Sequence, residues 1–342
     1  MNMQILVKLV GLVFRAFIAL VFLVVLFALW LFLKPMRYHD LVSAVSADTS
    51  YDRALRRLDA LRALDTPDID SLAQTILLTH GRRVSRVVVF YHGITNCPNQ
   101  FRALGKQFYD LGYNVLIPRQ PHHGLKDKMT DDLKNLTAEE LTRFTDETLD
   151  IAGGLGEEIT VAGLSAGGVM AAWAAAHRSD VRRAVVIAPI LCSKLVRDDF
   201  AKPAASLLLT LPNQFIWWRE DEKENLKGTA LVYPRFSTHA MGEVLRLSLS
   251  VLSYAESRAP VAGSIVMITN ENDAAINNET CDRLIELWRQ RGAATVHTYC
   301  FPASDSLSHD LIDPGQPTQR TAVSYPTLIR LINGVSMSAL AQ

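Results

Sequence analysis

One serine of this 342-residue chain lies in a glycine-rich stretch whose spacing suits a nucleophile. Ser165 is the central residue of GLSAG (163–167), which follows the apolar run ITVAG and precedes AGGVMAAWAAA. The spacing fits G-x-S-x-G, whose glycines allow a sharp turn between a strand and a helix. Such a turn raises the hydroxyl above the sheet, over a helix N-terminus. We therefore expect Ser165 to be a nucleophile; the alternative is a helix start with small residues chosen for close packing.

A serine nucleophile needs a base, and a neutral imidazole base needs an acceptor that holds its tautomer. His309, in SDSLSHDLI, follows the last expected strand in a polar loop, and we expect it to be the base. Asp273, in MITNENDAAIN, follows the preceding expected strand, and we expect it to be the acid. Carboxylates close to His309 in sequence remain alternatives to Asp273: Asp305, Asp310 and Asp313. Other histidines show no defined role: His80, His122, His123, His177, His239 and His297.

Acyl transfer also needs two backbone N–H groups that meet the oxyanion of a tetrahedral intermediate. One is expected from Ala166, the residue after the nucleophile. The other is expected from Ile94, which follows His92-Gly93 in the loop after the strand VVVFY (87–91). The similar THG at 79–81 ends a weaker apolar run, and we do not expect it to take part.

Strands and helices alternate in the pattern of the sequence, which predicts a doubly wound, mostly parallel sheet covered by helices. Short apolar runs predict strands at 87–91, 114–118, 159–163, 184–189, 264–269 and 295–301. Helical patterns lie near 99–111, 138–152, 166–178, 278–291 and 318–333.

Residues 191–258 interrupt this alternation and predict a helical cap insertion with a helix near 240–256. Ligands bind at the carboxyl edge of such sheets, so the insertion is placed to roof a pocket. Its apolar residues either form a lid suited to a lipid-like substrate or only pack the insertion: Leu207, Leu208, Leu209, Phe215, Trp217 and Trp218.

The N-terminus contains a segment long and apolar enough to cross a membrane. Ala16 to Leu33 are 18 residues without a charge, which as a helix span roughly 27 Å, close to the hydrocarbon thickness of a bilayer. We expect an uncleaved single-pass anchor in residues 1–37. A cleaved signal peptide is the alternative, because VSAVSA (42–47) supplies small residues. Basic residues on the two sides nearly balance, so the orientation stays open.

Between the anchor and the first expected strand, residues 38–79 predict a juxtamembrane helix and linker. Within SYDRALRRLDALRALD (50–65), leucines recur at three-residue steps on one face: Leu55, Leu58, Leu61 and Leu64. The remaining chain, 80–342, is expected to form one α/β domain.

Composition excludes several classes of partner and cofactor. Lys plus Arg and Asp plus Glu are both 35, and no basic stripe interleaves with aromatics, so we expect no nucleic-acid partner. The four cysteines form no C-x-x-C pair and no histidine lies at ligand spacing, so we expect no metal and no cofactor. Disulfides between Cys281 and Cys300 or between Cys97 and Cys192 stay open, beside free thiols.

Four motifs in order give the chain a resemblance to a known family. They are HGITNCPNQFRALGKQFYDLGYNVLIPRQPHHG, VAGLSAGG, NENDAAIN and SLSHDLI. Together they resemble the α/β-hydrolase fold, and within it the carboxylesterase and monoacylglycerol-lipase-like serine hydrolases, over about residues 80–333. The resemblance implies Ser165 as nucleophile, Asp273 as acid and His309 as base, with an oxyanion hole from Ile94 and Ala166. It also implies a structural role for His123-Gly124.

The sequence therefore predicts a membrane-anchored serine hydrolase of carboxylic esters, acting on an acyl or lipid-like small molecule. An acyltransferase or thioesterase on the same fold is one alternative. A non-catalytic, membrane-tethered binding module is another. Substrate identity, membrane orientation and oligomeric state are not predicted.

Overall fold

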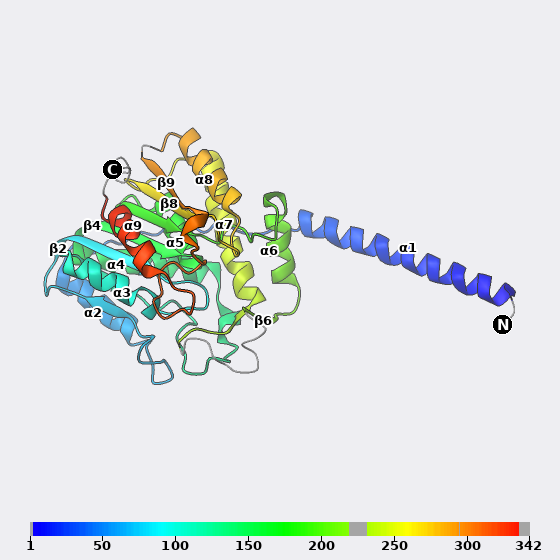
Figure 1. Ribbon diagram of the computed structural model, residues 1–342, viewed down its shortest axis with the longest axis horizontal. Coiled ribbons are helices and arrows are strands. Elements are labelled where there is room, and N and C mark those ends of the chain that lie inside the picture. The colour runs from blue at the N-terminus through cyan, green and yellow to red at the C-terminus, as the bar shows by residue number, and fades with distance from the viewer. Residues whose placement is uncertain (1–2, 219–230, 294, 335–342) are drawn as a thin grey trace.

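The computed structural model describes residues 3–218, 231–293 and 295–334, and its centre is one twisted sheet (Figure 1). The strand order is β1-β3-β2-β4-β5-β8-β9; β1 is antiparallel to β3 and all other neighbours are parallel. The strands are β1 (Ile76–Leu78), β2 (Val84–Tyr91), β3 (Asn114–Ile117), β4 (Gly156–Leu164), β5 (Val181–Ile187), β8 (Ile265–Asn270) and β9 (Val296–Phe301). Strand β4 is the central strand of the seven, so the turn that follows it lies at the centre of the carboxyl edge of the sheet.

Helices cover both faces of this sheet, as the alternating pattern predicted. They are α3 (Asn99–Asp110), α4 (Ala138–Leu155), α5 (Ala166–His177), α7 (Thr238–Ser257), α8 (Asn278–Gln290) and α9 (Thr321–Asn333). Helix α5 is almost entirely buried, because alanines and glycines let it approach the strands closely. Short 3₁₀ turns are η1 (Asp132–Asn135), η2 (Asp198–Phe200) and η4 (Ala303–Asp305).

The six strands expected from the sequence all occur, with ends that differ by a few residues. Three short strands were missed because each has only three residues: β1, and the pair β6 (Phe215–Trp217) and β7 (Arg235–Ser237) of a separate small sheet. Strand β1 begins before residue 80, the expected start of the α/β domain. The sheet therefore includes residues 76–78, which belong to the segment 38–79 that the sequence predicted to be a juxtamembrane helix and linker.

The insertion between β5 and β8 is helical as expected, but its apolar residues are used differently from a lid. Helix α6 (Ala201–Thr210) packs on α7, where Leu208 and Leu209 meet Gly242. The Arg235 guanidinium carbon lies 4.3 Å from the centre of the Phe215 ring, over its face. Of the six apolar residues that the sequence offered for a lid, Trp218 alone lines the cavity beside Ser165. Leu208, Leu209 and Phe215 pack within the insertion itself, which is the second of the two uses that the sequence left open.

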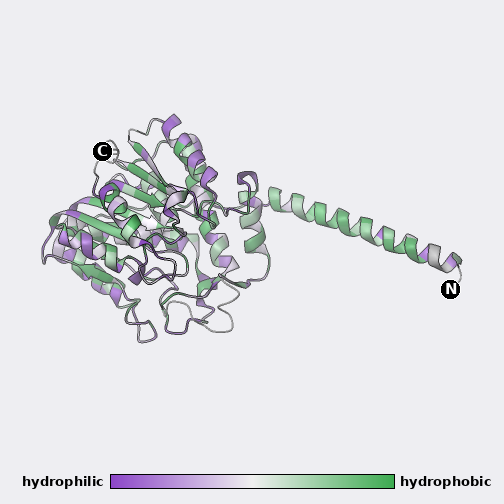
Figure 2. Cartoon of the chain, viewed as in Figure 1, coloured by the Kyte–Doolittle hydropathy of each residue, from purple (hydrophilic) through white to green (hydrophobic). Residues whose placement is uncertain are grey.

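Helix α1 (Met3–Leu33) projects away from the domain and is apolar along its length (Figures 1 and 2). Within the described residues, Lys8–Leu33 is the one helix long and apolar enough to cross a membrane, and only 6% of its most apolar window is buried. The end of α1 contacts η2 and α6: the Phe32 and Phe200 rings are 5.4 Å apart, and just after the helix Lys34 Nζ donates to Thr210 Oγ1 at 2.6 Å. The candidate anchor therefore joins the domain at the insertion.

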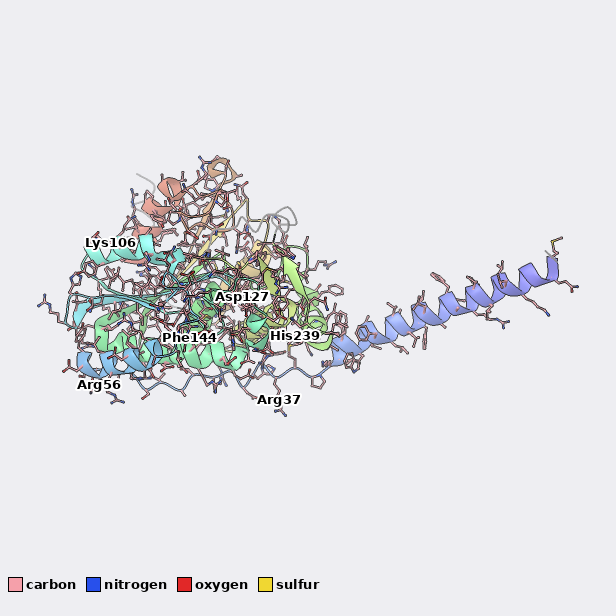
Figure 3. All side chains as sticks on the ribbon, turned by 90° about the horizontal axis from the view of Figure 1, so that it is seen from below. Arg37, Arg56, Lys106, Asp127, Phe144 and His239 are labelled. Carbon is pink, nitrogen blue, oxygen red and sulfur yellow. The ribbon has the colours of Figure 1, made fainter. Side chains whose placement is uncertain are left out.

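An extended segment, residues 38–50, links α1 to α2 (Tyr51–Arg62), and we call it the strap. Figure 3 shows the chain passing Arg37 and running along the domain to α2, which carries Arg56. Helix α2 packs on α4 and buries Ala54, Leu58 and Leu61. Helix α2 ends at Arg62, so Leu64 lies beyond the helix and is 62% exposed.

Candidate active site

Ser165 lies at the turn between β4 and α5, in a backbone conformation that most residues avoid. Its φ is 60° and its ψ is −115°. A Cβ on Gly163 would lie 2.0 Å from the Gly167 carbonyl oxygen, and one on Gly167 would lie 2.1 Å from the Tyr91 carbonyl oxygen. A side chain at either position would collide with the backbone, so both positions require glycine. Strain of this kind is typical of functional turns.

His309 and Asp273 meet although 36 residues separate them in the chain. The His309 Nδ1 lies 2.7 Å from Asp273 Oδ2. The other carboxylate oxygen, Oδ1, accepts from the backbone N–H groups of Ala275 and Ile276 at 2.8 and 3.2 Å. Asp273 is 1% exposed, so its charge is held by these three donors in place of water.

The pair shifts the pKa of both partners. Burial alone would lower the pKa of His309, but the hydrogen bond and charge of Asp273, with the charge of Asp310, outweigh burial and raise it above its ordinary value. Burial would raise the pKa of Asp273, but the His309 contact and the two backbone N–H groups outweigh burial and lower it. An ionised Asp273 beside His309 keeps a proton on Nδ1, which leaves Nε2 free to accept one.

The oxyanion loop, which we define as residues 92–96, is held from several sides. Gln120 Nε2 donates to the His92 carbonyl at 2.7 Å, and His123 Nε2 lies 2.6 Å from the Ile94 carbonyl oxygen. Burial lowers the pKa of His123 to about 4, so this ring is neutral at pH 7. The Ile94 and Ala166 N–H groups donate to no acceptor among the described residues. These two amides are the expected oxyanion donors; Ile94 lines the cavity beside Ser165, and Ala166 directly follows Ser165 in the chain.

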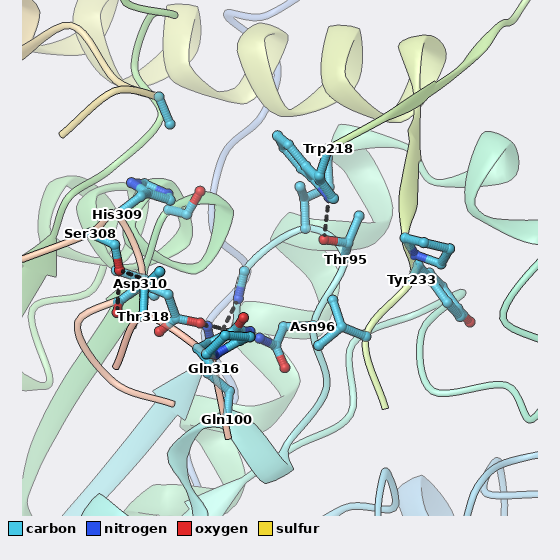
Figure 4. A pocket seen from close by; sticks show the side chains of 18 residues that line it. Thr95, Asn96, Gln100, Trp218, Tyr233, Ser308, His309, Asp310, Gln316 and Thr318 are labelled. Carbon is cyan, nitrogen blue, oxygen red and sulfur yellow. Dashed lines mark hydrogen bonds between the residues drawn. The ribbon is translucent and has the colours of Figure 1, made fainter. Parts of the chain in front are cut away.

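A cavity of about 300 Å³ brings these groups to one place (Figure 4). Ser165, His309 and the oxyanion loop line it, and Asp273 lies behind His309. Its apolar wall includes Ile94, Leu164, Trp218, Val232, Pro234, Ala275 and Pro317. No hydrogen bond joins Ser165 to His309 in this structure, although both are described; the two side chains share the cavity with no direct contact of that kind.

Other sequence candidates lie elsewhere. Asp310 bonds to Gln100, and Asp313 is buried beside it with a pKa raised to about 6 by burial and then by the charge of Asp310. The THG at 79–81 lies between β1 and β2 and does not line the cavity. All four cysteines lie in the described ranges and are free, so neither pairing left open by the sequence occurs. The part of the chain that the structure describes holds no cluster of His, Cys, Asp and Glu able to bind a metal ion.

Sequence reasoning missed two polar residues beside the cavity. Gln100 lies in the first turn of α3 and was read only as part of the segment after the glycine loop. Asp310 was considered only as an alternative partner of His309. Nothing in their local sequence distinguishes them from surface residues, because their partners lie about 210 residues away along the chain.

Comparison with known proteins identifies relatives of this chain. The model of the alpha/beta hydrolase family matches residues 76–321. A thermostable monoacylglycerol lipase of Bacillus sp. (strain H-257) is 31% identical over 100 residues, which are 28% of this chain and 36% of that enzyme. The chain thus aligns with about a third of the length of the curated relative it matches.

Solved structures of two lipases resemble the fold. A Paleococcus ferrophilus monoacylglycerol lipase is 16% identical, with a TM-score of 0.55 over 77% of this chain and 100% of that one. A soluble variant of Saccharomyces cerevisiae monoglyceride lipase, in complex with a substrate analog, is 13% identical, with a TM-score of 0.53 over 76% and 90%. At these identities the likeness establishes the shared fold.

Proposed function

Because this chain belongs to the α/β-hydrolase family, we propose that it is a membrane-anchored serine hydrolase that cleaves carboxylic esters through Ser165, His309 and Asp273. One observation carries the proposal. The His309 ring, paired with the buried Asp273, reaches the same cavity as a serine held at a φ of 60° on a strand-to-helix turn. Structural packing alone gives no reason for a strained serine, a paired histidine and Ile94, whose N–H has no acceptor among the described residues, to share one cavity.

The proposed reaction uses each of these groups once. Ser165 Oγ attacks the ester carbonyl carbon while its proton passes to His309 Nε2, and Asp273 stabilises the imidazolium. The carbonyl oxygen becomes an oxyanion that accepts from the Ile94 and Ala166 N–H groups. His309 then gives its proton to the alcohol as the C–O bond breaks. Water, deprotonated by His309, attacks the acyl-enzyme, and the acid and free Ser165 are released.

The cavity supports an acyl or lipid-like substrate. Ile94, Leu164 and Trp218 line it together with Ser165. Its volume, about 300 Å³, is at the small end of ligand pockets. The named relatives are monoacylglycerol lipases, and we propose a monoacylglycerol-like ester as the first substrate to test. Transfer of the acyl group to an alcohol, or cleavage of a thioester, would use the same groups and is separated by product analysis.

The hydrogen bonds of the strap support an uncleaved anchor. Ser43 Oγ and the Ala44 N–H donate to Asp146 at 2.5 and 2.8 Å, and the Ser46 N–H donates to Asp150 at 3.1 Å. Trp173 Nε1 donates to the Leu41 carbonyl at 2.7 Å. The small-residue stretch 42–47, the alternative cleavage site, thus forms part of the folded domain. Cleavage there would cut a bonded segment.

Activity-based labelling tests the nucleophile and the membrane topology together. Intact cells or spheroplasts are treated with a fluorophosphonate probe, with and without a permeabilising agent, and the labelled peptide is identified by mass spectrometry. We expect a labelled Ser165 on a chain that retains residues 1–37. Wild-type protein that resists the probe and turns over no ester would support the non-catalytic binding module.

A further inference from the structure

The side chain of Gln100 connects the two loops that carry the proposed donors and base. It is 2% exposed. Its Oε1 accepts from the Gly93 N–H at 2.9 Å, and its Nε2 donates to Asp310 Oδ2 at 2.8 Å. Figure 4 shows Gln100 and Asp310 together at the edge of the cavity, with His309 nearby. One buried amide therefore spans the oxyanion loop and the loop of residues 306–313.

An amide suits these two partners better than any other side chain of this size. The Gly93 N–H needs an acceptor and the Asp310 carboxylate needs a donor, and an amide supplies one of each. Glutamate would oppose a carboxylate with a carboxylate. Methionine would leave the buried Gly93 N–H unpaired and would leave Asp310 Oδ2 with the longer contact to Asn96 Nδ2, at 3.5 Å. The partners also determine how the amide is turned.

Each end of this bridge touches a residue next to a reacting group. Gly93 directly precedes Ile94, whose N–H is unpaired, and a Cβ placed on Gly93 would lie 3.7 Å from the Ser165 Cβ. Asp310 directly follows His309 and contributes to raising the pKa of its ring. The other Asp310 oxygen accepts from the Ile312 and Asp313 N–H groups at 3.0 Å each, so the loop is folded around this carboxylate.

We propose that Gln100 is a positioning residue that holds the Ile94 amide and the His309 ring at the separation needed for acyl transfer. This inference rests on the proposed function. The bridge keeps the electrophilic and the basic sides of the site from moving apart when the cavity is empty. Its loss would chiefly affect the transition state, in which the oxyanion and the imidazolium exist together.

Kinetics of Gln100→Met test this role against a matched control. Gln107→Met changes the same residue type on the same helix, at an exposed position. We expect Gln100→Met to lower kcat between about 10- and 100-fold with KM changed less than about twofold, because misplacement of about 1 Å has effects of this size. Gln107→Met should leave both constants unchanged. A kcat for Gln100→Met within twofold of wild type, measured well below its unfolding temperature, would overturn the proposal.

A double-mutant cycle with Asp310→Ala tests the bridge itself. If the two side chains act through one another, Gln100→Met should add less than about twofold to the loss caused by Asp310→Ala. Multiplicative effects would show that the residues act separately and would overturn the proposal.

Hydrogen–deuterium exchange read by mass spectrometry supplies a measurement that needs no substrate. In the full-length chain, Gln100→Met should speed exchange in peptides covering both 92–96 and 306–313, whereas Gln107→Met should not. Unchanged exchange in both loops would overturn the bridge. Wild-type protein that is inactive and unlabelled at Ser165, with faster exchange in the variant, would instead overturn the proposed function.

Discussion

Two buried polar clusters in this molecule differ in how completely their groups are paired. Around Arg178, which is fully buried, all five guanidinium N–H groups have acceptors: Asp180, Asp146 and Asp150 carboxylates at 2.7 to 2.9 Å, and the Asp146 carbonyl at 3.2 Å. Around Ser165, the Ile94 and Ala166 amides have no acceptor among the described residues. The difference indicates that the fully paired Arg178 cluster stabilises the fold and that the Ser165 cluster has donors available for a ligand.

The Arg178 cluster also holds the strap in place. Asp146 and Asp150 bind Arg178 on one side and the strap on the other. Removing a partner of such a buried carboxylate leaves its charge uncompensated and destabilises the folded state. The Ser165 cluster has the opposite character, since its strained backbone and unpaired donors lower the stability of the folded state, which fits the reactive role that we propose for it.

The largest effect that would sharpen this comparison comes from Ser165→Ala. We expect turnover of a short p-nitrophenyl ester to fall by about 10⁴-fold or more, because the nucleophile is lost. The midpoint of thermal unfolding should not fall, since the Ser165 hydroxyl has no hydrogen-bond partner among the described residues. An unchanged rate in this assay would exclude Ser165 as the nucleophile.

The converse change is Arg178→Met, which should affect stability and leave the chemistry intact. Three carboxylates would lose their buried partner, and we expect the free energy of unfolding to fall by about 3–5 kcal/mol. The measurement is thermal or denaturant unfolding of the detergent-solubilised chain. Arg56→Met, at an exposed position of α2, is the control and should change little. A lower kcat per folded molecule for Arg178→Met, with stability intact, would reverse the assignment of the two clusters.

The pH dependence of kcat/KM reports the proposed base. His309 must be neutral to accept a proton, and its pKa in the folded chain is raised above 6.5. Activity should therefore rise with pH through a midpoint above 6.5, changing about tenfold per pH unit below that midpoint. The same shift means that the His309–Asp273 pair stabilises the fold below the unfolded pKa, and that this contribution is lost as pH rises through the folded pKa. A midpoint below 6.5 would contradict the pairing.

The smallest effect is expected within the strap. Ser43→Ala removes the hydroxyl that donates to Asp146 and should lower the free energy of unfolding by about 1 kcal/mol. Ser46→Ala is the matched control, because Ser46 binds Asp150 through its backbone N–H and its hydroxyl makes no hydrogen bond in the described part of the chain. Equal midpoints of thermal unfolding for the two variants would mean that the Ser43 hydroxyl contributes nothing.

Regular elements of four or more residues were largely predictable because their signals are local. An apolar run between turn residues predicts a strand wherever it occurs, and the runs of β2, β4, β5 and β8 were read correctly. Strands of three residues, such as β1, are too short to show a period. The apolar residues of α6 were ambiguous for another reason: hydrophobicity does not say whether a leucine packs on a helix or lines a cavity.

The sequence by itself determined the order of strands and helices, the candidate anchor and the sharp turn at Ser165, because apolar period, length and glycine spacing act over a few neighbouring residues. Only the tertiary structure decided which carboxylate meets His309, that Asp310 turns toward Gln100, and that the strap binds α4. Those contacts join residues tens to hundreds of positions apart. A hydrogen bond depends on distance and direction in space, and local sequence carries neither.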